Sequence, residues 1–490
     1  MTPPNMPSPQ TATSPTTAPA LTTTETRAAV NDLIGKFNYK PQPEGQKLIN
    51  ELVADFLKHN PAAAALAKKM KAETGTRFPD WIDHIQVGST AAIKKRLVEV
   101  GFVLNPQPGA DECYTHDGAM FPAIVLVAGK AVRVAIKVEG VMDYLIAHRI
   151  NEGEIHGEPG GQFRMAPAQM GVDGFDLFIV ERHGCRGYVA PKFDAVKAAQ
   201  AAWHAEALRR RRREFDNDAD GFKELNRNVD AAIADLGRDW ASDIFFAAER
   251  CYWMQRNRAG MVQYARQQKL GLGWANHDHH TYRSSRDHFT KLIAVFEKLG
   301  FTCRERFYAG HEAQWGAQVM EQAATGVTTF NDVDMSPEEL LGDFGHEGFS
   351  QSRDRLGTVG LWCGLHGEAI LQAGMHHLEA QFDWQALVEQ LEQVAQVRTM
   401  APFTTFKYLR QAFTEGETWQ VSEKRLQKLL LSKLITTEQA SMFRQEGALG
   451  SHLENLERND GFKGFNQEGV SDIIARTDPR KMTKMHAVGA

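Results

Sequence analysis

An eight-residue segment near the middle of the chain holds the side chains best suited to chemistry. Residues 276–283 read Asn-His-Asp-His-His-Thr-Tyr-Arg and are predicted to form a β-strand. Because strand side chains alternate between faces, one face should carry His277, His279, Thr281 and Arg283, and the other Asp278, His280 and Tyr282. An imidazole beside a guanidinium places a metal ligand next to an anion-binding group. This pattern favours a metal enzyme that acts on a carboxylate, although a polar strand edge could carry the same residues.

Length and composition indicate an ordinary globular protein. The chain has 490 residues, of which 42% are hydrophobic and 24% charged, which allows two or three domains with sizeable cores. The net charge of −5 provides no overall basic field for nucleic acid. No apolar run approaches the length of a membrane span. We therefore expect small-molecule partners rather than nucleic acid or a membrane.

The cysteines and the N-terminus indicate a cytoplasmic protein. Five cysteines are scattered singly along the chain, with no Cys-x-x-Cys pair: Cys113, Cys185, Cys251, Cys303 and Cys363. Such a set favours free thiols in a reducing compartment over a disulfide framework or a cysteine-rich zinc site. Residues 1–25 are rich in Pro, Thr, Ser and Ala and lack the apolar segment of a secretory signal, so a disordered tail is predicted there.

Hydrophobic periodicity divides the rest of the chain into three regions. They are an N-terminal α+β region over 26–190, a helical connector over 191–270 and a second α+β region over 271–490. The first region should contain a hairpin between strands 123–127 and 132–138. The connector contains five consecutive arginines, 209–213. Because four acids follow within seven residues, a solvated helix face is favoured over a nucleic-acid patch.

A weak internal repeat links the two α+β regions. Asp83-His84 and Asp278-His279 each begin a predicted strand, a helix follows, and each helix ends in a Gly-Phe pair. The copies differ four residues after the histidine, where Gly88 stands in the first and Arg283 in the second. The pattern predicts paired modules, of which only the second keeps the anion-binding group.

Two later segments could complete a metal site with His279. A mononuclear iron(II) site for oxygen chemistry often uses two histidines and one carboxylate. Residues 375–381 supply adjacent histidines, and residues 451–458 supply a histidine and two glutamates. Structural roles are also open to them, as pocket-lining or helix-capping histidines and as acids of a surface ion-pair strand or helix. Spacing alone does not join segments that lie so far apart.

The order of these motifs resembles one known family. Asp278-His279-His280-Thr281-Tyr282-Arg283-Ser284 is similar to the Asp-His-x-x-x-Arg-Thr/Ser strand of the 2-oxoadipate dioxygenase/decarboxylases, also called hydroxyglutarate synthases, and their plant relatives. His377-Leu378 resembles the family's Asn-His-Leu segment, and residues 453–458 resemble its Ile-Glu-x-x-Glu-Arg strand. Asp460-Gly461-Phe462 follows, as in the plant-type relatives. The resemblance covers roughly residues 271–478.

The resemblance implies a set of site residues. His279, His377 and Glu454 would bind iron(II), and Arg283 would grip a substrate carboxylate. Two choices stay open, because His376 stands in place of the family's asparagine and competes with its neighbour, and because Glu457 competes with Glu454. Arg410 offers either a second anion contact or a surface charge.

The resemblance also implies a fold and a reaction. The fold would be α+β, with vicinal-oxygen-chelate-like mixed β-sheet modules curved around a metal site and substantial helical insertions. The protein would be an iron(II)-dependent dioxygenase/decarboxylase that uses O₂ to convert a 2-oxo acid similar to 2-oxoadipate into a 2-hydroxy acid and CO₂. A zinc or manganese isomerase or lyase on the same scaffold is the alternative, because two histidines and a glutamate do not select the metal. A non-catalytic binding protein is a third possibility.

Overall fold

Two mixed β-sheets organise the chain in the computed structural model, which describes residues 23–35, 39–130, 132–310, 313–350, 353–400, 404–466 and 478–480. The predicted α+β class with mixed β-sheet modules is therefore confirmed. Most of the predicted tail lies outside the described residues, whereas residues 23–25 begin helix α1 (Thr23–Gly35). The division into domains stays a prediction.

The first sheet has seven strands in the order β2-β3-β4-β1-β5-β7-β6. They are β1 (Ile82–Gly88), β2 (Val103–Leu104), β3 (Cys113–Thr115), β4 (Ala123–Val127), β5 (Arg133–Lys137), β6 (Phe163–Gln169) and β7 (Leu177–Arg182). Helix α4 (Ala91–Glu99) joins β1 to β2, and α5 (Val141–His148) joins β5 to β6. The predicted hairpin of residues 123–127 and 132–138 is wrong, because β1 lies between β4 and β5 and pairs with both.

The second sheet has eight strands in the order β13-β14-β17-β12-β8-β11-β10-β9. They are β8 (His277–Arg283), β9 (Thr302–Tyr308), β10 (Trp315–Gln322), β11 (Val327–Asp334), β12 (His377–Gln381), β13 (Thr404–Phe406), β14 (Leu409–Phe413) and β17 (His452–Arg458). Helix α10 (Phe289–Lys298) follows β8, and α13 (Trp384–Gln393) follows β12. The sheet is thus two strand–helix–three-strand units joined where β8 and β12 pair antiparallel.

The two sheets share this plan. β1 pairs parallel with β4 and antiparallel with β5, as β8 pairs parallel with β11 and antiparallel with β12. In both sheets the leading strand has a bulge at its aspartate, Asp83 or Asp278. Each aspartate binds an arginine at the end of the matching strand, Arg182 on β7 or Arg458 on β17, through two hydrogen bonds of 2.8–3.0 Å. The register therefore relates equivalent positions in the two sheets.

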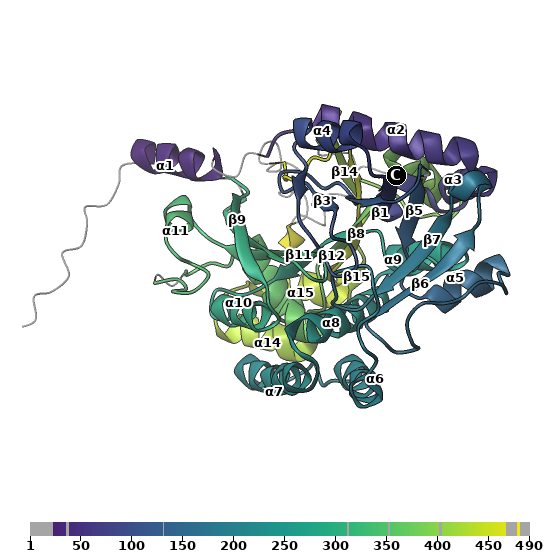
Figure 1. The fold of residues 1–490 in the computed structure, drawn as a ribbon. Helices are drawn as coiled ribbons and strands as arrows, with labels where there is room; N and C mark the ends of the chain where they lie inside the picture. The colour runs from purple at the N-terminus through teal and green to yellow at the C-terminus, as the bar shows by residue number, and fades with distance from the viewer. Residues whose placement is uncertain are drawn as a thin grey trace, which may run out of the picture.

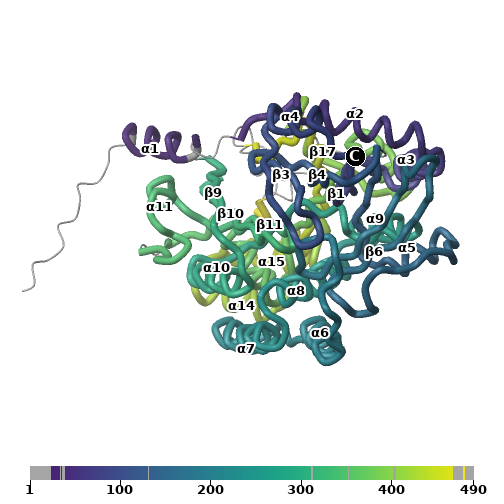
Figure 2. The backbone as a smooth tube through the Cα atoms, in the orientation of Figure 1, coloured from purple at the N-terminus to yellow at the C-terminus, as the bar shows by residue number. Residues whose placement is uncertain are grey.

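Helices cover the sheets and fill the connector. The N-terminal pair α2 (Pro43–His59) and α3 (Pro61–Thr74) packs its apolar stripe on the first sheet. The connector forms α6 (Ala195–Arg209), α7 (Asp218–Leu236), α8 (Arg238–Met254) and α9 (Arg258–Gln268). Figures 1 and 2 show α6 and α7 at the end of the molecule opposite α2 and α4. The remaining elements are α11 (Pro337–Leu341), α12 (Thr358–His366), α14 (Glu423–Leu431), α15 (Thr437–Glu446), the short strands β15 (Thr418–Trp419) and β16 (Ala448–Leu449), and single turns at 78–81, 172–174 and 369–373.

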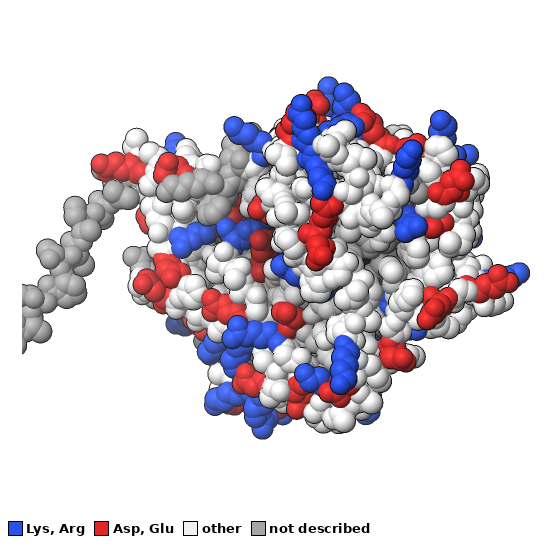
Figure 3. Space-filling model, in the orientation of Figure 1, with Lys and Arg blue, Asp and Glu red and all other residues white. Residues whose placement is uncertain are grey.

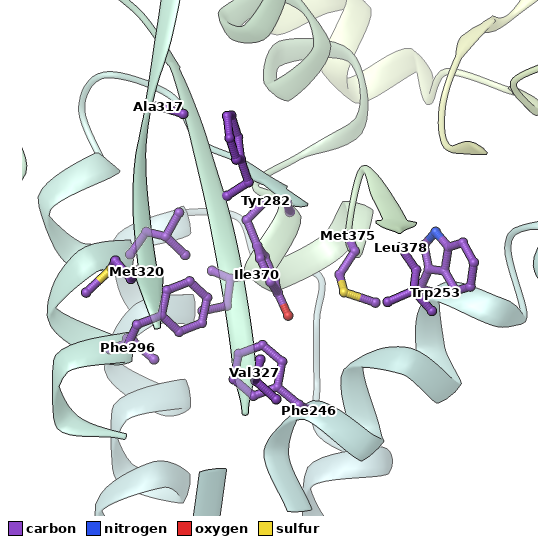
Figure 4. Packing of buried hydrophobic residues seen from close by; sticks show 14 of the residues in the cluster. Phe246, Trp253, Tyr282, Phe296, Ala317, Met320, Val327, Ile370, Met375 and Leu378 are labelled. Atoms are coloured by element: carbon purple, nitrogen blue, oxygen red, sulfur yellow. The ribbon is translucent and has the colours of Figure 1, made fainter. Parts of the chain in front are cut away.

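The largest core lies between the second sheet and helices α8 and α10. Tyr282 on β8 points into this core, where its ring centroid is 5.1 Å from that of Phe296 and 6.3 Å from that of Phe246 (Figure 4). Leu378 of β12 and Leu453 of β17 belong to the same cluster. Burial of these side chains fixes one face of the sheet against helix, so alternate residues of β8, β12 and β17 must point to the opposite face.

The arginine run is solvated only in part: Arg209, Arg210 and Arg212 are exposed, whereas Arg211 and Arg213 are not. Helix α6 ends at Arg209, and the chain turns so that Arg211 and Arg213 are buried with 2.6 Å contacts to Glu249 of α8. Arg211 also donates a hydrogen bond to the backbone carbonyl of Ile370, and Arg213 donates one to that of Leu371. The prediction was therefore wrong for Arg211 and Arg213, because a fully buried acid from a distant helix, rather than the acids that follow in sequence, neutralises them.

The surface carries both charge signs, and Lys, Arg, Asp and Glu intermingle over the face shown in Figure 3. Among the described helices none combines the length and apolarity that a membrane crossing requires.

His183 is predicted to stay protonated well above neutral pH. Burial would lower the pKa of His183, but the carboxylates of Asp243 and Glu181, 2.9 and 3.0 Å away, outweigh it and raise the pKa to about 10. Because the folded pKa is raised, the stabilisation is complete below the ordinary histidine pKa of about 6.5 and is lost as pH rises through about 10. The stability difference between the wild type and His183→Gln should therefore shrink between pH 8 and pH 10.5. An imidazole that NMR shows to be neutral at pH 8.5 would contradict the assignment.

Candidate metal centre

Three adjacent strands bring the predicted ligands together. β12 lies between β8 and β17, with Glu379 opposite His279 and beside Glu454, and with His377 opposite Thr281. Donor atoms of His279, His377 and Glu454 all lie within 4.8 Å of one another, and all three side chains are buried. Residues separated by about a hundred positions in sequence therefore meet on the sheet face opposite the α10 core.

The donor atoms are arranged around a small space. His377 Nε2 lies 2.8 Å from Glu454 Oε2 and 2.7 Å from Thr281 Oγ1. The ring centroids of His279 and His377 are 5.7 Å apart. Two imidazoles and one carboxylate are a common donor set for a divalent transition metal. The residues present therefore fit a metal ion.

The structure separates the alternatives that the sequence left open. The ring of His376 packs 5.4 Å from that of Trp362, and its Nδ1 lies 3.1 Å from the carbonyl oxygen of Gly450. Glu457 points to the helix side of β17, where it accepts a hydrogen bond of 3.0 Å from the backbone N–H of Trp384. His377 and Glu454, rather than His376 and Glu457, thus lie beside His279.

The predicted alternation of side chains along β8 holds from His279 to Arg283 but fails before His279. The bulge at Asp278 turns this carboxylate towards the His279 side, where its Oδ1 lies 3.3 Å from His279 Nδ1. His277 is placed with His280 instead, with ring centroids 5.1 Å apart. One extra residue in a strand shifts the pattern by one position, so His277 does not join the metal site.

Sequence reasoning missed two side chains that contact the candidate ligands. Glu379 Oε1 lies 3.0 Å from His279 Nδ1, and Gln411 donates to both Glu379 (3.0 Å) and Glu454 (3.2 Å). Glu379 follows His377 by two residues and so shares its strand face, a signal that the sequence contained. Gln411 lies on β14, and no local pattern marks it.

Further donors extend the cluster on both sides. Asp278, His279 and Glu379 form a second group with donor atoms within 4.8 Å, and His376, His377 and His452 form a third. Each group shares a residue with the predicted set. The alternatives for a metal thus overlap in one continuous site.

The electrostatics of the cluster are suited to binding a cation. Burial raises the pKa of the Glu454 carboxyl well above its usual range, and neighbouring Glu379 adds to this effect. Burial lowers the pKa of His377, with His452 contributing. For His279, burial is outweighed by Glu379 and Asp278, which raise its pKa to about 9. Protons on His279 and Glu454 would leave when a metal binds, because ligands must be deprotonated.

Arg283 lies on the same strand face as His279, and its guanidinium is only partly paired. Its Nε is buried without a hydrogen-bond partner among the described residues and lies 3.7 Å from Asp332 Oδ2. The guanidinium stands 5.6 Å from the ring centroid of Trp362. Burial raises the pKa of Asp332 to about 7 even though Arg283 lowers it. Such a guanidinium can accept a ligand carboxylate.

Arg410 does not join the site. It is exposed on β14, whereas its neighbour Gln411 is buried and contacts the candidate ligands. Because successive strand residues face opposite ways, the structure places Arg410 on the outer side of the sheet. Of its two sequence interpretations, the surface charge is the one that its position supports.

Aromatic side chains cover His279. The ring of Phe465 lies 5.1 Å from that of His279 and 5.1 Å from that of Phe330, which itself stands 5.8 Å from His279. These apolar rings exclude bulk water from one side of the candidate ligands.

Comparisons with known proteins give only remote likenesses. No family model matches the chain, and no curated protein matches it in sequence. A glyoxalase-superfamily protein from Ralstonia eutropha JMP134 is 11% identical over 45% of this chain and 84% of its own, with a TM-score of 0.32. Methylmalonyl-CoA epimerase from Mycobacterium tuberculosis is 11% identical over 38% and 88%, with a TM-score of 0.22. A variant of 4-hydroxymandelate synthase from Streptomyces coelicolor is 11% identical over 83% and 99%, with a TM-score of 0.24. Likenesses this remote carry no inference about activity.

Proposed function

We propose that the protein is an iron(II)-dependent dioxygenase/decarboxylase that converts a 2-oxo acid, O₂ being the co-substrate, into a 2-hydroxy acid and CO₂. The observation that carries the proposal is the convergence of His279, His377 and Glu454 on one buried point beside Arg283. The motif resemblance to the hydroxyglutarate synthases supplies the reaction class.

The side chains of the site would have different roles in this reaction. His279, His377 and Glu454 would hold the metal, and iron(II), when bound there, supplies coordination positions at which a 2-oxo acid and O₂ react together. Arg283 would bind a substrate carboxylate through paired hydrogen bonds, which orients the acid. Gln411 holds the Glu454 carboxylate in place through its 3.2 Å hydrogen bond.

A non-oxidative isomerase or lyase is the second candidate. Glu379 supports it, because this fully buried carboxylate lies beside the three candidate ligands and is not needed as one of them. A carboxylate in that position could act as a general base on a metal-bound substrate. Zinc or manganese would serve such a reaction as well as iron.

Oxygen consumption separates the two candidates. The protein would be purified without oxygen, loaded with iron(II), zinc or manganese, and supplied with a panel of 2-oxo acids that includes 2-oxoadipate. The proposal requires O₂ uptake and CO₂ release in equal amounts, and only with iron. Turnover of an acid without O₂ uptake would establish the alternative and overturn the proposed reaction.

Arg283→Lys is expected to impair substrate binding while leaving metal content unchanged. A lysine keeps the charge but loses the planar pair of donors, so the Michaelis constant for the 2-oxo acid should rise about tenfold or more. Arg410→Lys is the matched control, because Arg410 is exposed on the outer side of the sheet. Steady-state kinetics under saturating O₂ would measure both variants. Equal Michaelis constants in the two would remove Arg283 from the substrate site.

A further inference from the structure

A large cavity lies between the two sheets, at the strand ends that carry their paired aspartates and arginines, and Asp278, which contacts His279, is part of its wall. Its volume is about 1240 Å³, and its wall includes Asp83, Lys137, Arg182, Tyr188, Arg250 and Tyr264. Neither the three candidate ligands nor Arg283 lines it. A cavity of this size exceeds the usual range of small-molecule sites, about 300–1,000 Å³, so it has room for a ligand of its own.

The position of this cavity follows from the shared plan of the two sheets. His84 is the register equivalent of His279, but Ala135 and Phe178 stand where the second sheet has Glu379 and Glu454. The first sheet therefore keeps one histidine and the paired aspartate and arginine, and lacks the carboxylates of the metal site. The cavity lies at the ends of its strands that carry this aspartate and arginine.

Lys137 is the unusual group of the cavity wall. It is the register equivalent of Gln381, which donates a 3.0 Å hydrogen bond to Asp278. Asp83 is the equivalent of Asp278, and its carboxylate is already hydrogen-bonded to Arg182 and His84. Among the described residues, the Lys137 ammonium forms no hydrogen bond and no ion pair within 4.0 Å, and Asp83, Asp80 and Asp278 act on it only from farther away.

The other charges of the wall are largely matched. Asp80 pairs with Arg77, Asp83 with Arg182, Asp278 with Arg458, Asp243 with His183 and Glu139 with Arg250. Arg186 and Arg209 also line the cavity, but both are exposed to solvent. Lys137 is thus the half-buried cation of the wall that has no acid partner within 4.0 Å in the described part of the chain, and burial lowers its pKa. A charge shielded from water without a partner is unfavourable. A singly charged anion would balance Lys137, whereas a dianion would leave negative charge near the carboxylates of Asp80, Asp83 and Asp278.

We propose that this cavity is a second ligand site, in which Lys137 binds the carboxylate of a small monocarboxylic acid and the aromatic wall holds its body. Tyr188 and Tyr264, which are both half-buried, supply that wall. The site does not rest on the proposed oxygenase reaction, because His279, His377, Glu454 and Arg283 are not part of its wall.

Calorimetric titration of the full chain with phenylacetate tests the site, in the presence of a chelator so that no metal contributes. We expect saturable binding that Lys137→Met weakens about tenfold or more, as loss of a charge-assisted hydrogen bond would. Lys130→Met is the matched control, since Lys130 is exposed in the turn between β4 and β5. Arg283→Lys should bind phenylacetate as the wild type does.

A second measurement uses the wild-type protein alone and so does not depend on the folding of a variant. Reductive methylation with formaldehyde and cyanoborohydride should modify Lys137, and phenylacetate should protect it, as peptide mass spectrometry would show. Inorganic phosphate, mostly a dianion at pH 8, should protect less. Undiminished binding by Lys137→Met, absence of saturable binding to the wild type, loss of binding in Arg283→Lys, or better protection by phosphate would each overturn the proposal.

Discussion

Glu454→Gln is expected to abolish tight metal binding while the chain stays folded. The amide has nearly the shape of the carboxyl group but carries no negative charge, so it is a poor ligand for a divalent transition metal. In the metal-free protein, burial and the neighbouring Glu379 already favour the neutral form of Glu454, whose pKa they raise. The substitution should therefore cost little stability. Metal retained after anaerobic loading and desalting should fall at least about tenfold relative to the wild type.

Glu457→Gln is the control for this experiment. Glu457 lies on the same strand, three residues further on, but faces α13 and accepts a hydrogen bond from the Trp384 backbone. Its variant should retain metal like the wild type. Equal metal content in both variants would show that Glu454 is not a ligand, and loss only in Glu457→Gln would reverse the assignment of the two acids. His279→Ala gives an independent measurement at the same site and should lose metal as well.

Glu249→Gln should destabilise the protein more than most single substitutions. Glu249 is fully buried on α8, and its carboxylate neutralises Arg211 and Arg213, each 2.6 Å away. The amide would leave two buried guanidinium groups without a counter-charge. Removing one partner of a buried ion pair costs about 3–5 kcal/mol, and we expect a loss of this order in the free energy of unfolding, measured by urea denaturation.

Glu206→Gln provides the comparison for Glu249. Glu206 pairs with Arg210 one residue before the buried arginines, but both side chains are largely exposed. Surface substitutions of this kind change stability by about 0.5 kcal/mol or less. Similar unfolding midpoints for the two variants would mean that Arg211 and Arg213 are solvated, as their sequence pattern suggested.

The fold class and much of the candidate site could be read from local patterns. Alternation on a strand predicts that His279, Thr281 and Arg283 share one face. The helical stripe of α10 and the strands β9 and β10 were also predictable, because short-range periodicity encodes them. The order of three short motifs pointed to the segments 375–381 and 451–458, but left open the choice between His376 and His377 and between Glu454 and Glu457.

Pairing between strands that are distant in the sequence produced the differences between the predictions and the structure. The bulge that moves Asp278 to the metal side and His277 away from it arises where β8 meets β12, about a hundred residues further on. Gln411 contacts Glu454 because β14 pairs with β17. The supposed hairpin failed for the same reason, since β1 inserts between its strands.

Residue types and their spacing thus specified which side chains could do chemistry and, from His279 to Arg283, which of them share a strand face. Strand register, burial and charge pairing specified which of them meet. These depend on contacts between segments that are distant in the chain, where the free energy comes from packing and desolvation of the whole assembly rather than from local conformational preference. The burial of Arg211 and Arg213 on Glu249 illustrates this: the sequence shows the charges, and the fold chooses their partner.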